Sequence, residues 1–200
     1  MDKTMELNSN GLGLEQIANY QSEMKLLESR VIMISEGINS AVAKKVITHL
    51  LALDTQGDNP ITVYLNSPGG EVNSGFAIYD TMKFLNSEVR IVCSGLTASI
   101  ATVILLGAPK QHRYTLANTK FLIHQPLIGG TVQGQASDLE ITAREIIKTR
   151  KKINELLSQE CGQPFAKVEE DTTRDYWMSA KEAIEYGLVT KLVNNIKEIK

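Results

Sequence analysis

Apolar residues form two kinds of pattern that alternate along the chain. One is a short continuous run, and the other is a stripe at helical spacing. Four short apolar runs predict strands over residues 31–34, 61–65, 89–93 and 121–123. Helical spacing predicts helices over residues 14–27, 40–53, 72–85 and 98–106. Because the intervening connections are too short for anything but crossovers, this alternation indicates an α/β fold with a mostly parallel sheet covered by helices.

The pattern changes after Pro126, where a polar, glycine-rich stretch precedes one long helical stripe over residues 136–157. A helix of about 22 residues is roughly 33 Å long, which is long for a small domain. We therefore expect this helix to project and pack against another subunit. The C-terminal part predicts a short helix, capped near Ser179 and ended by Gly187, and then a last strand.

The 200 residues are enough for one domain with a substantial core, and composition excludes several function classes. With 21 Lys and Arg against 23 Asp and Glu, and no basic stripe, nucleic-acid binding is not expected. Cys93 and Cys161 form no CxxC pair and no metal-ligand spacing, so they predict reduced structural thiols. The absence of a signal-peptide core or bilayer-length apolar segment predicts a cytoplasmic protein without a membrane partner.

Ser99 is the candidate nucleophile. The pattern places a strand end at Cys93, a turn at Ser94 and Gly95, and then the start of an apolar helix. A hydroxyl at a helix start lies beside unpaired backbone N–H groups, which suits chemistry that forms an oxyanion. The local sequence is not the G-x-S-x-G elbow, and a serine here is more often an N-cap or a packing residue.

The turn Ser67-Pro68-Gly69-Gly70 follows another predicted strand and opens another helix. Its glycines allow the backbone to approach a substrate closely and to present N–H groups to an anion. A plain strand-to-helix turn is an equally good interpretation of this motif alone.

The chain contains three histidines, of which His124 is the candidate base. It directly follows a predicted strand and so lies at a sheet edge where α/β folds bind ligands, although a structural role is the alternative. His49 and His112 are interpreted as structural or solvated. For an acid that would orient the imidazole, both Asp171 and Asp175 are candidates. The apolar residues that follow Asp175 predict partial burial, which favours it slightly.

Six stretches, in this order and spacing, resemble the proteolytic subunit of the Clp protease, the ClpP family of serine peptidases. They are YLNSPGG (64–70), AIYDTMKFL (77–85), GLTASIA (95–101), FLIHQP (121–126), GQASDLEITAREI (134–146) and RDYWMSAKEAIEYGLV (174–189). The resemblance runs from about Val31 to Val193.

The resemblance implies the roles of individual residues. Ser99 would be the nucleophile, His124 the general base and Asp175, rather than Asp171, the residue that orients it. The backbone N–H groups of Gly70 and Ile100 would form the oxyanion hole. Three glycines would flank the substrate strand: Gly69, Gly129 and Gly130.

The resemblance also implies an assembly and its partners. The fold would be a parallel-sheet core of the ClpP/crotonase type with a handle formed by a strand and the long helix. One domain would comprise an arm and first helix (1–30), a head (31–126 and 159–200) and the handle (127–158). Two stacked heptamers would dock through the handles, with Arg174 at the contact. A ring-shaped AAA+ ATPase such as ClpX, ClpA or ClpC would dock at Tyr64 and Phe84 and deliver unfolded proteins. No cofactor or metal is expected, because ATP would be used by the partner.

Several positions depart from the family pattern and leave alternatives. Thr97 and Ile100 replace the usual neighbours of the serine, Thr173 stands where an acidic residue pairs across the rings, and Thr62 replaces a docking aromatic. These departures motivate a structural or regulatory ring subunit that is active only in a mixed assembly with a paralogue. A crotonase-like acyl-CoA enzyme, which shares the sheet and the glycine oxyanion hole, is a more distant alternative.

Overall fold

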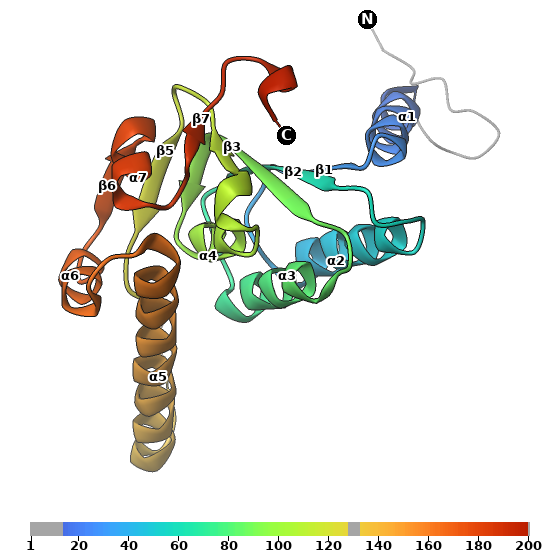
Figure 1. The fold of residues 1–200 in the computed structure, drawn as a ribbon. Helices are drawn as coiled ribbons and strands as arrows, with labels where there is room; N and C mark the ends of the chain where they lie inside the picture. Colours follow the sequence, from blue (N-terminus) through green and yellow to red (C-terminus); the bar gives the residue numbers. More distant parts are fainter. Residues whose placement is uncertain (1–13, 128–132, 200) are drawn as a thin grey trace, which may run out of the picture.

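The computed structural model describes residues 14–127 and 133–199, and its strands pair into one sheet that is parallel except at one edge (Figure 1). Along the sheet the order is β1-β2-β3-β4-β7, while β5 pairs with β3 and then with the antiparallel β6. The strands are β1 (Val31–Ile34), β2 (Ile61–Ser67), β3 (Val89–Ala98), β4 (Arg113–Thr115), β5 (Lys120–Ile123), β6 (Tyr176–Ser179) and β7 (Lys191–Leu192). The predicted α/β fold with a mostly parallel sheet is confirmed.

Helices alternate with these strands as the apolar pattern predicts. They are α1 (Leu14–Glu28), α2 (Ser40–Asp54), α3 (Val72–Phe84), α4 (Ile100–Leu106), α5 (Ala136–Cys161), α6 (Phe165–Asp171) and α7 (Ala180–Tyr186), with 3-10 turns at Lys110–His112 and Ile196–Glu198. Both predicted ends of α7 are confirmed. Ser179 and Glu182 form a reciprocal capping box, and Gly187 ends the helix at φ 96°, a conformation that favours glycine.

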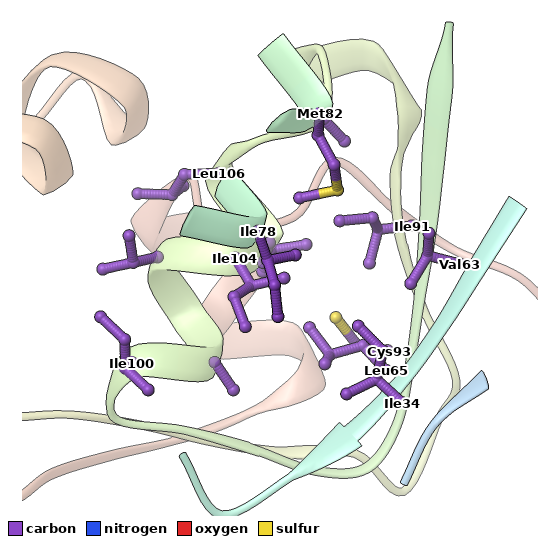
Figure 2. Close-up of a cluster of buried hydrophobic side chains, with 14 of the residues drawn as sticks. Ile34, Val63, Leu65, Ile78, Met82, Ile91, Cys93, Ile100, Ile104 and Leu106 are labelled. Atoms are coloured by element: carbon purple, nitrogen blue, oxygen red, sulfur yellow. The ribbon is translucent and has the colours of Figure 1, made fainter. Parts of the chain in front are cut away.

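The core lies between the sheet and helices α2, α3 and α4. Branched side chains of the central strands point toward the inner faces of α3 and α4, as Figure 2 shows. The labelled members are Ile34, Val63, Leu65, Ile91 and Cys93 from the strands, and Ile78, Met82, Ile100, Ile104 and Leu106 from the helices. Every residue of α4 is buried, so the element that follows Ser99 is held firmly in the core.

Helix α5 extends well beyond the rest of the chain (Figure 1). Its buried residues are confined to its second half: Ile153, Asn154, Leu157 and Cys161. Toward its N-terminal end apolar side chains face outward, with Ile141 58% and Ile147 66% exposed. The long helix is therefore as predicted, and apolar side chains remain exposed on its N-terminal half. The boundaries of the handle, 127–158, stay a prediction.

Strand β3 differs from the prediction. Ser94 and Gly95 do not form a turn; the strand continues to Ala98, and α4 begins only at Ile100. The first part of β3 pairs with β4 and the last part with β5, so Ser94 and Gly95 mark the exchange of partners. Gly95 adopts φ 62°, and the Asn66 side chain accepts a hydrogen bond from the backbone N–H of Leu96 at 3.0 Å. Turn-forming residues thus occur inside a strand because its ladder is interrupted there.

Short elements of the C-terminal half are absent from the sequence prediction, namely β4, α6 and β6. Each has at most seven residues, too few for a periodic pattern to be distinctive. Within 14–127 and 133–199, no helix is long and apolar enough to cross a membrane. Both cysteines are buried and free of disulfides.

Candidate active site

Ser99 occupies the single residue between β3 and α4, in a conformation that few side chains adopt. Its φ of 56° and ψ of −127° lie outside the favoured regions for a residue other than glycine. Its backbone N–H donates to the carbonyl of Leu122 in β5 at 2.9 Å, which fixes the corner in place. The hydroxyl does not cap α4, although an N-cap role was an open alternative, and it remains available for another partner.

That partner is His124, the residue after β5. Strands β3 and β5 are parallel, and the pairing of Ala98 with Leu122 carries both chains to the same sheet edge. The distance between Ser99 Oγ and His124 Nε2 is 2.8 Å, a hydrogen bond of ordinary length. The imidazole side chain is 14% exposed, so little solvent competes for this bond.

Asp175 lies on the other side of the same imidazole. In the antiparallel pairing of β5 with β6, Ile123 is opposite Tyr176, so the next residues outward are His124 and Asp175. Asp175 Oδ1 lies 3.1 Å from His124 Nδ1. Because an ionised carboxylate only accepts hydrogen bonds, this contact keeps the proton on Nδ1 and leaves the Nε2 lone pair facing the serine hydroxyl.

The burial argument for Asp175 was wrong, although the structure does bring this residue to the imidazole. Its side chain is 61% exposed, whereas that of Asp171 is 13% exposed. Asp171 is turned toward Tyr186 and Lys167 instead of His124. Aromatic neighbours in the sequence therefore do not predict that an aspartate in a loop is buried.

At Gly69 and Gly70 the backbone packs too closely against its neighbours to leave room for a side chain. A Cβ on Gly69 would lie 2.7 Å from that of Ser99, and a Cβ on Gly70 would lie 2.1 Å from the carbonyl oxygen of Ile38. The N–H of Ile38 donates to the carbonyl of Gly69, and the carbonyl of Ile38 accepts from the N–H of Glu71. The N–H of Gly70, which lies between these two groups, takes no part in this bridge.

Ile100 supplies a second unpaired N–H. As the first residue of α4 it precedes every intrahelical acceptor, so its N–H has no partner within the helix. It follows the serine directly, and a Cβ on Gly69 would lie 3.1 Å from its nitrogen. A backbone donor directly after the serine is able to bind developing negative charge.

The remaining predicted residues are distributed over the molecule. Tyr64 packs beside a small apolar cluster on the sheet, and Phe84, the last residue of α3, is 83% exposed. Arg174 lines a hollow of about 350 Å³ together with His124 and Asp175. Gly129 and Gly130 lie outside the described residues.

The two other histidines have partners of their own. His112 bonds to the hydroxyl of Tyr114 and to Glu88. Burial lowers the pKa of His49, on α2, below its usual value. Their interpretation as structural or solvated residues agrees with these contacts. No group of three potential metal ligands occurs in the part of the chain that the structure describes.

Sequence reasoning missed an apolar pocket that adjoins Ser99. It is lined mostly by branched side chains from four separated elements: Val72, Ile100, Val103, Ile123, Ile153 and Leu157. It also missed Gln125, whose N–H donates to the carbonyl of Thr172 at 2.7 Å and whose side chain donates to the carbonyl of Thr173 at 2.8 Å. Gln125 thereby fastens the histidine segment to the loop of Asp175. Only its place next to His124 would have drawn attention to it.

Comparison with known proteins places the whole chain in a family. The family described as Clp protease matches residues 15–196. The chain belongs to the Clp protease family. Curated relatives in Rhizobium etli and Rhizobium johnstonii, both named ATP-dependent Clp protease proteolytic subunit 3, are 46% identical over 198 residues and cover 99% of this chain and 96% of their own length.

A solved structure supports the same assignment. A ClpP1 mutant from Listeria monocytogenes superposes with a TM-score of 0.82 at 37% identity and covers 90% of this chain and 99% of its own. The ClpP fold and the class of the protein, a serine endopeptidase, follow from these matches. They do not favour the acyl-CoA enzyme or the structural or regulatory ring subunit that is active only in a mixed assembly.

Proposed function

We propose that this Clp protease subunit hydrolyses peptide bonds with Ser99 as nucleophile, His124 as general base and Asp175 as the residue that orients the imidazole. One observation carries the proposal: the imidazole bridges the serine hydroxyl at 2.8 Å and the carboxylate at 3.1 Å. These contacts are within the reach that proton transfer requires.

The geometry supports a two-step reaction. Ser99 Oγ attacks the carbonyl carbon of the scissile bond while its proton passes to His124 Nε2, and the resulting imidazolium is stabilised by Asp175. Nε2 then returns the proton to the leaving amine, and the C–N bond breaks to give an ester on Ser99. A water molecule, deprotonated by Nε2, attacks the carbonyl carbon of this ester. The C–Oγ bond breaks to release the acid, and Nε2 returns the proton to Oγ.

The N–H groups of Gly70 and Ile100 are proposed as the oxyanion hole. Neither is engaged by the bridge to Ile38 or by α4, so both remain free for a substrate. A donor of this kind contributes on the order of 3 kcal/mol in comparable enzymes, because it binds the oxyanion better than the ground-state carbonyl.

The substrate is proposed to lie extended beside Gly69 and Gly70, with Gly129 and Gly130 on its other side. Backbone pairing of this kind accepts many sequences, which suits a protease for unfolded proteins. The apolar pocket beside Ser99 would receive one side chain of the peptide.

The assembly is proposed to be two stacked heptamers that dock through residues 127–158, with Arg174 near the contact. The exposed apolar residues of α5 and Leu127, which is 76% exposed, support a contact there. An AAA+ ATPase such as ClpX, ClpA or ClpC would dock at Tyr64 and at the exposed Phe84 and deliver unfolded chains in the cytoplasm.

A fluorophosphonate probe tests the nucleophile. We expect wild type to be labelled at Ser99 and Ser99→Ala to remain unlabelled while folding and assembling normally. Equal labelling of the two proteins would refute the assignment. The native mass of the pure protein, measured with its hydrolysis of a short fluorogenic peptide, tests whether it is active without a paralogue. An inert pure particle that becomes active on mixing would favour the mixed assembly.

A further inference from the structure

Asp175 has few contacts of its own to hold it against the histidine. Its side chain is 61% exposed, and His124 is its only hydrogen-bond partner among the described residues. Its position must therefore be set by the backbone, namely by the short segment between the end of α6 at Asp171 and the start of β6 at Tyr176. Whatever fixes the two ends of this segment also places the carboxylate.

The end toward α6 is tied down by hydrogen bonds. The Thr172 carbonyl accepts from the N–H of Gln125 at 2.7 Å, and its hydroxyl donates to the side chain of Asn154 at 3.0 Å. The end at Tyr176 is held by fewer hydrogen bonds. Strand β6 has four residues and pairs only with β5, and Tyr176 is its first residue. A terminal pair of a short edge strand opens easily unless side chains hold it.

A cluster of four side chains, which we term the Lys167 cluster, joins the two ends. Lys167 Nζ lies 2.6 Å from Asp171 Oδ2, and the hydroxyl of Tyr186 donates to the same oxygen at 3.0 Å. The ammonium also lies 4.9 Å from the ring centroid of Tyr186 and 5.6 Å from that of Tyr176. The two rings are 5.8 Å apart.

The chemistry of the cluster suits a permanent anchor. Asp171 is largely buried and accepts two hydrogen bonds, one of them from a cation. Its hydrogen bond raises the pKa of Lys167 above its usual value, so the ammonium stays charged at the pH where a histidine base works. A cation over two aromatic faces attracts both of them, which draws the ring of Tyr176 toward α6.

We propose that Lys167, Asp171 and Tyr186 are positioning residues that hold Asp175 against His124 by clamping Tyr176 to the end of α6. The inference rests on the proposed triad and gives Asp171 a role of its own, because this residue anchors the loop that carries the acid. None of the three residues touches the reacting atoms. Loss of the clamp lets the first pair of β6 open and lets the carboxylate drift from Nδ1.

The test uses the full-length assembled protein and Lys167→Met, which removes the charge but keeps most of the side-chain length. We expect kcat for a fluorogenic peptide to fall about five-fold with KM nearly unchanged, because misplacement of the base affects the transition state more than binding. Lys167→Arg, which keeps both the charge and the stacking, should restore most of the rate. Lys45→Met is the matched control, because Lys45 forms an exposed 2.7 Å ion pair with Glu23; its kcat should equal that of wild type.

The rate of fluorophosphonate labelling separates positioning from simple loss of stability. A loosened Asp175 leaves the base poorly oriented, so the rate constant for labelling of Ser99 should fall about as much as kcat, while the final labelled fraction stays that of wild type. Fewer folded particles would lower the final labelled fraction without changing the rate constant. If Lys167→Met does not assemble, Tyr186→Phe removes the hydroxyl bond to Asp171 and should give the same loss on a smaller scale.

The outcomes separate this inference from the proposed function. A wild-type protein that neither cleaves peptide nor reacts with fluorophosphonate, either alone or mixed with a paralogue, would refute the triad itself. An active wild type with unchanged kcat and an unchanged labelling rate constant in both Lys167→Met and Tyr186→Phe would overturn the clamp alone. A loss in Lys167→Met that Lys167→Arg does not restore would also contradict it.

Discussion

His124 and Asp175 stand opposite each other one step beyond the last pair of the β5–β6 ladder, in which Ile123 faces Tyr176. They are 51 residues apart in the chain, and their side chains meet at 3.1 Å. The register of one short antiparallel pairing therefore places Asp175, and not a neighbouring residue, opposite the imidazole. A shift by one residue would turn the carboxylate to the other face of the sheet.

The choice between the two aspartates can be tested directly. Asp175→Asn should lower kcat by roughly 10³- to 10⁴-fold, because an amide that donates to Nδ1 stabilises the wrong tautomer and cannot balance the imidazolium charge. Asp171→Asn should lower it by only a few-fold, since Asp171 contacts Lys167 and Tyr186. The measurement is kcat with a fluorogenic peptide, with native mass as the control for assembly. A larger loss in the Asp171 variant would reverse the assignment.

Gly70→Ala should remove most activity. Its Cβ would lie 2.1 Å from the carbonyl oxygen of Ile38, and at φ 150° a side chain is strained in any case. The backbone must move, and with it the N–H proposed for the oxyanion hole, for which we expect a loss of about 10²- to 10³-fold in kcat.

Gly57→Ala is the matched control for that experiment. Gly57 also has a positive φ, 131°, but a Cβ there meets nothing within 4 Å. Comparison of kcat and melting temperature therefore separates backbone strain from displacement of the oxyanion hole. We expect the Gly57 variant to lose some stability and to keep its kcat, and similar kcat values in both variants would contradict the role of Gly70.

The two thiols should be inert in the folded protein. Burial raises the pKa of Cys93 and of Cys161 from about 9 to about 12. At pH 8 the thiolate fraction is then on the order of 10⁻⁴, and the thiolate is the nucleophile. A chromogenic disulfide reagent should react slowly at pH 8 in buffer and fast in denaturant. Fast reaction without denaturant would show that the thiols are accessible.

The same shift predicts a dependence of stability on alkaline pH. Above about 9 the thiols of the unfolded chain ionise while those of the folded chain stay protonated, so the unfolded state binds fewer protons. The free energy of unfolding should therefore fall as pH rises from about 9 toward 12. Denaturant titrations of wild type and of Cys93→Ala/Cys161→Ala check this, and the double variant should show a shallower decline.

An ion pair at the C-terminal end of α5 should be important for stability. The side chain of Arg113, on β4, is fully buried, where it donates to the carbonyls of Leu106 and Ala108 and pairs with Glu160. Glu160→Gln leaves this guanidinium without a counter-charge, which we expect to cost about 3 kcal/mol of unfolding free energy. Urea titration measures it. Glu155→Gln is the control, because the pair of Glu155 with Lys151 is exposed, and a loss as large as that of Glu160→Gln would contradict the prediction.

Much of the fold was predictable because its apolar periodicity is regular. Strands β1, β2 and β5 and helices α2, α3 and α5 lie close to their predicted positions, since a buried strand and an amphipathic helix each require a distinctive spacing of apolar residues. The exception in this region is β3, whose Ser94 and Gly95 have the composition of a turn. Only the presence of two partner strands at one edge keeps that segment extended.

The candidate site was predictable in its residue types but not in its physical detail. A serine after a strand, a histidine after another strand and a glycine pair at a turn could be selected, because parallel strands end at a common edge. The resemblance to the family was needed to choose Asp175, and the burial expected for it was wrong. Asp175 stands in a loop whose exposure depends on how α6 packs, which no local pattern records.

The sequence by itself determined the alternation of strands and helices, the buried face of each and the short list of residues able to carry chemistry, because these follow from spacing along the chain. Tertiary structure alone decided which members of that list meet and which aspartate is solvated. Such contacts depend on strand register and on packing between segments far apart in the chain. A change of one residue in register alters them without altering any local preference.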